Sequence, residues 1–201
     1  IFNLMKKILF IFIILFSTPS TSDEKIVTLA TVNNATITNA DLKDEMLILK
    51  ILSNFKEIDK NKLQQFAFQN LLNRTIKEIE IISNKIEINK YVNSKEYNDT
   101  KKKLIDNGIK SLRIHSRIKK KDQIDYGWKI LISRKYSWKL NINMNEINEK
   151  LITLGYVDPN NLNTIIAKNN LVTQEKNKKF NSYSRNHLDL AKKKLLIKIV
   201  K

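Results

Sequence analysis

The chain has 201 residues and no cysteine, which excludes disulfides, thiolate catalysis and cysteine–zinc sites. Lys and Arg number 37 against 20 Asp and Glu, so the formal net charge is +17. Such a balance usually indicates binding to nucleic acid or to an anionic membrane surface. Here, however, Lys, Asn and Ile are abundant together while Gly and Pro are scarce, a bias that is typical of genes with AT-rich codons. The basic residues are also scattered along the chain. We therefore expect no specific nucleic-acid binding, only a general attraction for acidic segments or lipid headgroups.

The N-terminal residues follow the order of a secretory signal. Residues 5–7 form a short basic start, residues 8–16 are an unbroken apolar run, and residues 17–22 are small and polar. The apolar run is shorter than the roughly 20 residues that span a bilayer. The sequence thus predicts a signal peptide over residues 1–22, a mature chain from about Asp23, export to the periplasm, and no stable membrane span after cleavage.

A small β-hairpin is predicted to open the mature chain. Residues 26–32 are rich in Val, Ile and Thr, as strands are, and residues 35–37 follow as a second short strand. Between them stand Asn33 and Asn34, a residue type that tolerates the positive φ of a tight primed turn.

Two helices are predicted to follow the hairpin, each with a side-chain cap. Thr38 and Asp41 are placed to cap a helix that runs to about residue 55. Asp59 is placed to cap the clearest amphipathic helix of the chain, residues 60–84. Its predicted apolar stripe comprises Leu63, Phe66, Leu71, Leu72, Ile76, Ile79 and Ile82, which leaves Phe68 off the stripe.

The remaining elements are predicted from weaker patterns. They are a helix capped by Asn89 that ends at Asn107-Gly108, a short helix over 111–120, a longer one over 123–140 capped by Asp122, one over 146–154 ended by Gly155, and a C-terminal helix over 180–201. Residues 162–179 fit no single pattern. The predicted fold class is mainly α, with a small N-terminal β-hairpin followed by a multi-helix domain that a C-terminal helix closes.

Several of these segments, taken in order, carry a resemblance to a known family. They are residues 32–34 with 41–42, then 71–89, 116–118, 124–128, and finally 179–180 with 195–200. A strand, an Asn turn and a helix begun by an acidic residue open the SurA-type periplasmic chaperones, and a C-terminal helix and strand close them. The chain is similar to this family over about residues 26–154 and 180–200.

The resemblance implies a division of the chain and an activity. It implies a SurA-like N-terminal helical domain over residues 23–154, a turn and connecting segment over 155–179, and a C-terminal helix over 180–201 that packs back on the N-terminal domain. Family members usually carry parvulin-type prolyl isomerase domains between these parts. The connecting segment is too short to hold a core of its own. The resemblance therefore implies a chaperone without isomerase activity.

No residue pattern predicts a catalytic or metal site. His115 and His187 are the two histidines, and neither has an acid, Cys or Ser in a catalytic spacing, so we expect both to be solvated. The acid pairs Asp44-Glu45 and Glu78/Glu80 are likewise expected to be solvated on helix faces. The three glycines stand alone, so no phosphate-binding loop indicates ATP or another cofactor.

Binding is therefore the expected activity, with aromatic side chains as the candidate residues. A chaperone for unfolded chains needs apolar and aromatic surface in a groove with charge around it. An aromatic residue at helical spacing belongs to the core more often than to a groove, so each candidate is compatible with either role. The candidate client-binding residues are Phe68, Tyr126, Trp128, Tyr136 and Trp138.

The sequence predicts an ATP-independent periplasmic chaperone that binds unfolded exported polypeptides. That these clients are outer-membrane β-barrel precursors is implied by the resemblance alone. Two alternatives stay open: a non-catalytic envelope scaffold that binds one folded partner, and a remnant isomerase with an unrecognised site. A chaperone would suppress the aggregation of its clients. A scaffold would form a single stoichiometric complex, and an isomerase would accelerate proline isomerisation.

Overall fold

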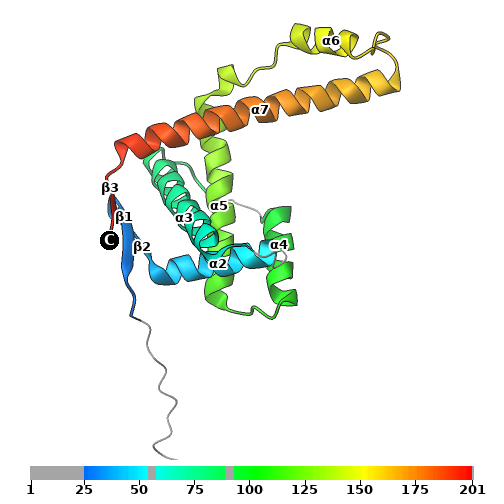
Figure 1. Cartoon of the computed structure of the whole chain (residues 1–201). Coiled ribbons are helices and arrows are strands. Elements are labelled where there is room, and N and C mark those ends of the chain that lie inside the picture. Colours follow the sequence, from blue (N-terminus) through cyan, green and yellow to red (C-terminus); the bar gives the residue numbers. More distant parts are fainter. Residues whose placement is uncertain (1–24, 54–57, 89–92, 201) are drawn as a thin grey trace, which may run out of the picture.

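The computed structural model describes residues 25–53, 58–88 and 93–200 (Figure 1). Over these ranges the chain forms six α-helices, a short 3-10 helix and a three-stranded antiparallel sheet. The predicted class, mainly α with a small N-terminal β-hairpin and a C-terminal helix, is confirmed. The expected signal peptide lies outside the described residues.

The hairpin is present, and it gains a third strand from the other end of the chain. β1 (Thr28–Val32) pairs with β2 (Ala35–Thr38), and Asn33 takes the positive φ, 51°, that the tight turn requires. β3 (Ile197–Ile199) pairs antiparallel with β1, which gives the strand order β2-β1-β3. The expectation of a helix through residue 201 is therefore wrong.

The strand replaces the end of the helix because Asn33 holds the chain there. The Asn33 N–H donates to the Leu196 carbonyl at 2.8 Å, and the Asn33 side-chain oxygen accepts from the Leu196 N–H at 2.9 Å. The alternation Ile197-Lys198-Ile199 also favours an extended backbone. The hairpin turn is thus tied directly to the C-terminal segment.

α2 (Asn39–Leu52) and α3 (Lys60–Ser83) begin at the predicted caps. The Asp41 N–H donates to the Thr38 hydroxyl at 3.2 Å, and the Thr38 N–H donates to the Asp41 carboxylate at 2.7 Å, which completes a reciprocal capping box. Asp59 accepts from a first-turn amide of α3 in the same way. The two helices and the sheet share one core, formed by Ala30, Val32, Ile37, Leu42, Ala67, Leu71, Leu72, Ile76 and Ala191.

α3 buries most of the stripe that was predicted, but not all of it. Leu63, Leu71, Leu72 and Ile76 are buried as predicted, and Ala67, four residues from Leu63 and from Leu71, lies in the core on the same side. Phe66 is, however, 62% exposed, so its assignment to the core is wrong. Phe68, predicted to lie off the stripe, packs partly buried against this core.

α4 (Lys95–Asp106) and α5 (Leu112–Lys135) differ from the prediction at their N-terminal sides. α4 begins at Ser94, while the expected cap Asn89 lies outside the described residues. α5 is one continuous helix where two helices separated at Asp122 were expected. Asp122 accepts hydrogen bonds from the Ser94 N–H at 3.1 Å and the Ser94 hydroxyl at 2.6 Å, so it supports the cap of α4 instead of starting a helix.

The C-terminal helix is much longer than predicted. After the 3-10 turn η1 (Ser137–Lys139) and α6 (Met144–Thr153), α7 runs without a break over Leu162–Lys194. The connecting segment expected at residues 155–179 is therefore wrong from residue 162 onward. Figure 1 shows α6 lying along the N-terminal half of α7, away from the sheet.

α6 supplies the packing that the sequence pattern of residues 162–179 did not reveal. Ile147 and Leu151 of α6 are buried, and the Lys150 ammonium lies 2.6 Å from the Glu175 carboxylate of α7. Packing against a neighbouring element, rather than intrinsic propensity, supplies most of the stability of a helix in a protein. We call α6 together with residues 162–179 the α6–α7 arm.

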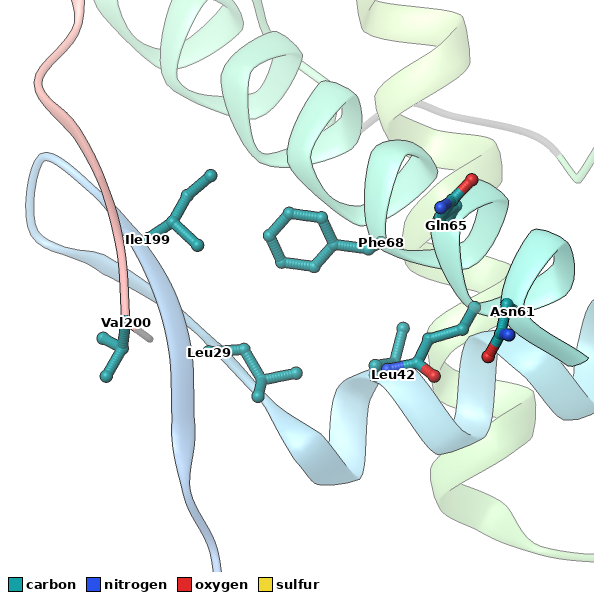
Figure 2. A pocket seen from close by; sticks show the side chains of 8 residues that line it. Leu29, Leu42, Asn61, Gln65, Phe68, Ile199 and Val200 are labelled. Carbon is teal, nitrogen blue, oxygen red and sulfur yellow. The ribbon is translucent and has the colours of Figure 1, made fainter.

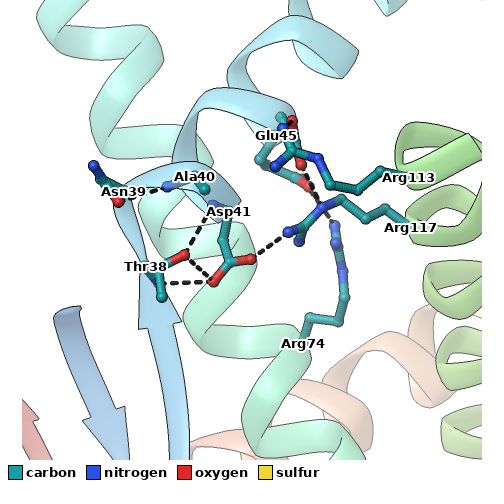
Figure 3. Close-up of polar contacts among 9 residues, drawn as sticks. Thr38, Asn39, Ala40, Asp41, Glu45, Arg74, Arg113 and Arg117 are labelled. Atoms are coloured by element: carbon teal, nitrogen blue, oxygen red, sulfur yellow. Dashed lines mark hydrogen bonds and ion pairs between the residues drawn. The ribbon is translucent and has the colours of Figure 1, made fainter. Parts of the chain in front are cut away.

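A cluster of ion pairs joins α2, α3 and α5 (Figure 3). Asp44 and Glu45 of α2 are buried, so the expectation that they are solvated is wrong. Arg74 of α3 donates to both Glu45 carboxylate oxygens at 2.8 Å. Arg113 and Arg117 of α5 each lie 2.6 Å from an Asp44 oxygen. The burial is possible because each carboxylate meets an arginine.

Asp41 connects the capping box to the same cluster, since Arg117 also pairs with its carboxylate. Burial raises the pKa of Asp41, but the hydrogen bond from the Thr38 amide and the Arg117 guanidinium outweigh burial and hold that pKa below its ordinary value. One acid thus fixes the exit of β2, the start of α2 and the position of α5.

We expect Arg74→Met to lower the free energy of unfolding by about 3 kcal/mol, because it leaves the buried Glu45 carboxylate without its partner. Urea unfolding followed by circular dichroism measures this loss. Arg113→Met is the matched control: Arg113 is 60% exposed and Asp44 keeps Arg117, so we expect a loss below about 1 kcal/mol. Equal losses in the two variants would contradict the proposed importance of burial.

Candidate functional site

An open groove of about 500 Å³ lies where the sheet faces α2 and α3 (Figure 2). Its apolar walls come from four separate elements and the residue after β3. They are formed by Leu29 of β1, Leu42 of α2, Phe68 of α3, Ile199 of β3 and Val200. The groove therefore exists only when both ends of the described chain are folded against the central helices.

One rim of the groove is polar but uncharged. Asn61, Gln64 and Gln65 line it from the first turns of α3, and all three are exposed. A carboxamide can donate and accept hydrogen bonds, so these side chains suit the backbone of a bound chain. None of the eight residues lining the groove is charged, although the chain as a whole is strongly basic.

Of the five aromatic residues predicted to bind a client, only Phe68 lies in this groove. Trp128 is 3% exposed and belongs to the core between α5 and α7, where its indole N–H donates to the Ser184 hydroxyl at 2.8 Å. Tyr136 is partly buried and stacks on Tyr183 of α7 with ring centroids 5.1 Å apart. These two predicted residues are brought together, but as packing between helices.

The other two candidates are accessible and lie outside the groove lining. Tyr126 on α5 is partly exposed, and Trp138 on η1 is 70% exposed. The ammonium group of Lys139 lies 4.7 Å from the centroid of the Trp138 ring, a cation–π contact. The predicted aromatic set is therefore spread over three environments and does not form one site.

The groove residues that sequence reasoning missed are aliphatic or carboxamide side chains. Leu29, Leu42 and Ile199 looked like ordinary core positions of a strand or a helix. Two signals pointed to a strand at Ile199, the alternation around Lys198 and the resemblance of residues 195–200 to a closing helix and strand, but neither identified β1 as its partner. The groove depends on the pairing of β3 with β1, two strands that lie far apart in the sequence, and no local pattern predicts that pairing.

His187 is buried, so the expectation that it is solvated is wrong. Its Nε2 lies 3.1 Å from a Glu80 carboxylate oxygen and its Nδ1 lies 3.1 Å from the Tyr136 hydroxyl. A neutral ring satisfies both contacts, with Nε2–H donating to Glu80 and Nδ1 accepting from Tyr136. His115 is also partly buried, with Nε2 3.0 Å from the Ile109 carbonyl.

The surroundings of His187 disfavour its charged form. Burial lowers the pKa of His187 below its ordinary value of 6.5, Lys135 acts in the same direction, and Glu80 opposes them without reversing the shift. This histidine joins α7 to α3 and α5 as a neutral hydrogen-bonding group, and its burial leaves it no access to a substrate.

Comparison with known proteins adds no relative from which a function can be transferred. No protein-family model matches the sequence, and no curated protein matches it significantly. Within residues 25–53, 58–88 and 93–200, no helix is long and apolar enough to cross a bilayer. Over the same ranges, no three His, Cys, Asp or Glu side chains are grouped so as to hold a metal ion.

We expect the protein to lose stability as the pH falls below 6.5. In that range the unfolded chain takes up a proton at His187 while the folded protein, with its lower pKa, does not, so acid favours unfolding. The loss is complete once the pH has passed the folded pKa. Urea unfolding at pH 7.5 and 5.5 measures the change, which His187→Gln should largely remove and His115→Gln should retain. An unchanged loss in His187→Gln would contradict this assignment.

Proposed function

We propose that this protein is an ATP-independent periplasmic chaperone that holds unfolded exported polypeptides, and that it has no catalytic activity. The observation that carries the proposal is the groove defined by Leu29, Leu42, Phe68, Ile199 and Val200. It is open and walled by apolar side chains, and none of its described lining residues is charged. An apolar concave surface that is accessible in a folded protein indicates a binding site.

The chemistry of the groove suits weak and tolerant binding. Aliphatic side chains and one phenylalanine bind many apolar sequences because burial of apolar area has no directional requirement. The surrounding lysines speed the encounter with acidic segments without being buried in the complex. This separation of apolar contact from charge lets one site accept clients of different sequence.

The resemblance to SurA-type chaperones supports the proposal through the order of elements. A strand, an Asn turn, capped helices and a C-terminal helix and strand that return to the hairpin occur here in that order. We extend the resemblance to the client class and propose outer-membrane β-barrel precursors. Residues 155–179 occupy the stretch where that family carries isomerase domains, and we propose no isomerase activity.

We expect the protein from Asp23 onward to suppress the aggregation of a barrel precursor diluted from urea, at near-equimolar ratio, as measured by light scattering. Phe68→Ala should raise the concentration needed for half suppression by about tenfold, the effect of losing roughly 1.4 kcal/mol of apolar burial. Phe66→Ala is the matched control, because Phe66 is the same residue type on the same helix and is not among the residues lining the groove. No suppression by the folded wild-type protein would overturn the proposal.

Phe68 also packs on the core, so a second variant separates binding from folding. Gln65→Glu places a charge in the groove at an exposed position of α3. We expect this variant to unfold at the same urea concentration as the wild type and to suppress aggregation less well, because a bound apolar segment would have to desolvate the carboxylate.

The α6–α7 arm favours the alternative, a scaffold that binds one folded partner. Ile152, Val157 and Leu162 lie on this arm and the loop between its helices, and each is more than 60% exposed, Val157 being 75% exposed. Together with Pro159 and Ile165, Ile152 and Val157 line a shallow hollow of about 180 Å³. A projecting apolar surface of this kind fits a single complementary partner.

The double variant Ile152→Asp/Val157→Asp distinguishes the two functions. If the groove holds clients, we expect this variant to suppress aggregation as well as the wild type, because both changes lie on the arm and outside the groove. If the scaffold is the correct function, the variant should instead lose one stoichiometric partner from a pull-down with envelope extract. Loss of aggregation suppression in this variant would move the client site from the groove to the arm.

A further inference from the structure

β3 presents an unpaired backbone edge next to the groove. The Asn33 N–H donates to the Leu196 carbonyl and the Val200 N–H donates to the Leu29 carbonyl, at 2.8 and 2.9 Å, so the backbone of residues 196 and 200 faces β1. Alternate residues of an antiparallel strand direct their backbone groups to opposite sides. The N–H and C=O groups of Ile197 and Ile199 therefore point away from β1.

No other strand covers that side of β3 in the described part of the chain. The strand order β2-β1-β3 places β3 at one end of the sheet. An edge of this kind accepts an extended chain, which pairs with it as an additional strand. Lys198 directs its side chain to the face opposite Ile199, because successive side chains of a strand alternate. A charged residue on a short edge strand disfavours pairing between two copies of the protein.

The free edge and the groove share residues. Ile199 contributes its side chain to the groove and its outward N–H and C=O to the edge, and Figure 2 shows its side chain directed toward Phe68. In an antiparallel pair, residues directly opposite one another have side chains on the same face. A chain paired with Ile197 and Ile199 would therefore place every second side chain on the face of the sheet that carries the groove.

The uncharged rim restricts what that chain can be. Asn61, Gln64 and Gln65 offer donors and acceptors, and within the described residues no intramolecular hydrogen bond uses their side chains. A charged segment would lose hydration there without gaining an opposite charge. The site is thus complementary to an extended, uncharged segment with apolar residues at alternate positions.

We infer that clients bind by strand addition: an extended segment pairs antiparallel with β3 and directs alternate apolar side chains into the groove beside Phe68 and Ile199. This inference rests on the proposed chaperone function and narrows its client class. Alternating apolar and polar residues are the pattern of transmembrane β-barrel strands. A continuous apolar segment gains no more burial in the groove, because the other half of its apolar side chains would face away from it.

Backbone-methylated peptides test the inference with the intact protein. The probe is a fluorescent peptide of alternating Val and Thr, whose Val residues would face the groove. In the antiparallel arrangement the same Val residues direct their N–H groups at β3, while the Thr N–H groups point away. We expect methylation of the Val amides to weaken binding by about tenfold and methylation of the Thr amides to change it less than about threefold. Equal affinity of the two methylated peptides would overturn strand addition.

Ile199→Pro provides the matching change in the protein. Proline removes the outward N–H of residue 199 and leaves the bonds from residues 196 and 200 to β1 in place. We expect weaker binding of the unmethylated peptide to Ile199→Pro than to Ile199→Val, which keeps the N–H, with both variants unfolding at similar urea concentrations. Equal binding by the two variants would contradict pairing at this edge.

The aggregation and peptide-binding measurements together distinguish a failure of strand addition from a failure of the proposed chaperone function. Suppression of precursor aggregation without any difference between the two methylated peptides would reject strand addition and leave the chaperone function standing. Failure to suppress aggregation together with failure to bind either peptide would reject both.

Discussion

The fold depends on a cluster of buried ion pairs between α2, α3 and α5. Arg74 and Arg117 pair with the buried Glu45 and Asp44, and the more exposed Arg113 adds a second partner for Asp44, so these ion pairs favour one mutual arrangement of the three helices. Apolar packing alone tolerates sliding and rotation of helices far better than this constellation does. Because α2 and α3 form one side of the groove, the Arg74–Glu45 pair between them also holds that side in place.

The same cluster accounts for three of the basic residues that do not line the groove. Three arginines are directed inward to acids of α2, while several lysines are exposed on α4 and α5. The groove lies between α2, α3 and the sheet, where the described lining is aliphatic, aromatic and carboxamide. The described lining is thus uncharged, although the exposed Lys60 and Lys62 flank Asn61 in the sequence.

α7 links the two ends of this molecule. Its C-terminal half packs through His187, Tyr183 and Ser184 on α5, and its end leads into β3, which completes both the sheet and the groove. Its N-terminal half, together with α6, forms the α6–α7 arm. Ile199 and Val200 are therefore part of the candidate site. They are positioned by α7, a helix that begins in the α6–α7 arm.

The sequence by itself determined the features that depend on neighbouring residues. The Asn turn, the capping box of Thr38 and Asp41, the Asp59 cap and the mainly α class follow from local backbone chemistry, which acts within a few residues. Only the tertiary structure decided the partners of each helix and the limits of its buried face, because these depend on residues far away in the chain. It reversed the roles of Phe66 and Phe68, buried His187 and the two acids of α2, extended α7 against α6, and brought Ile199 beside β1 to form the groove.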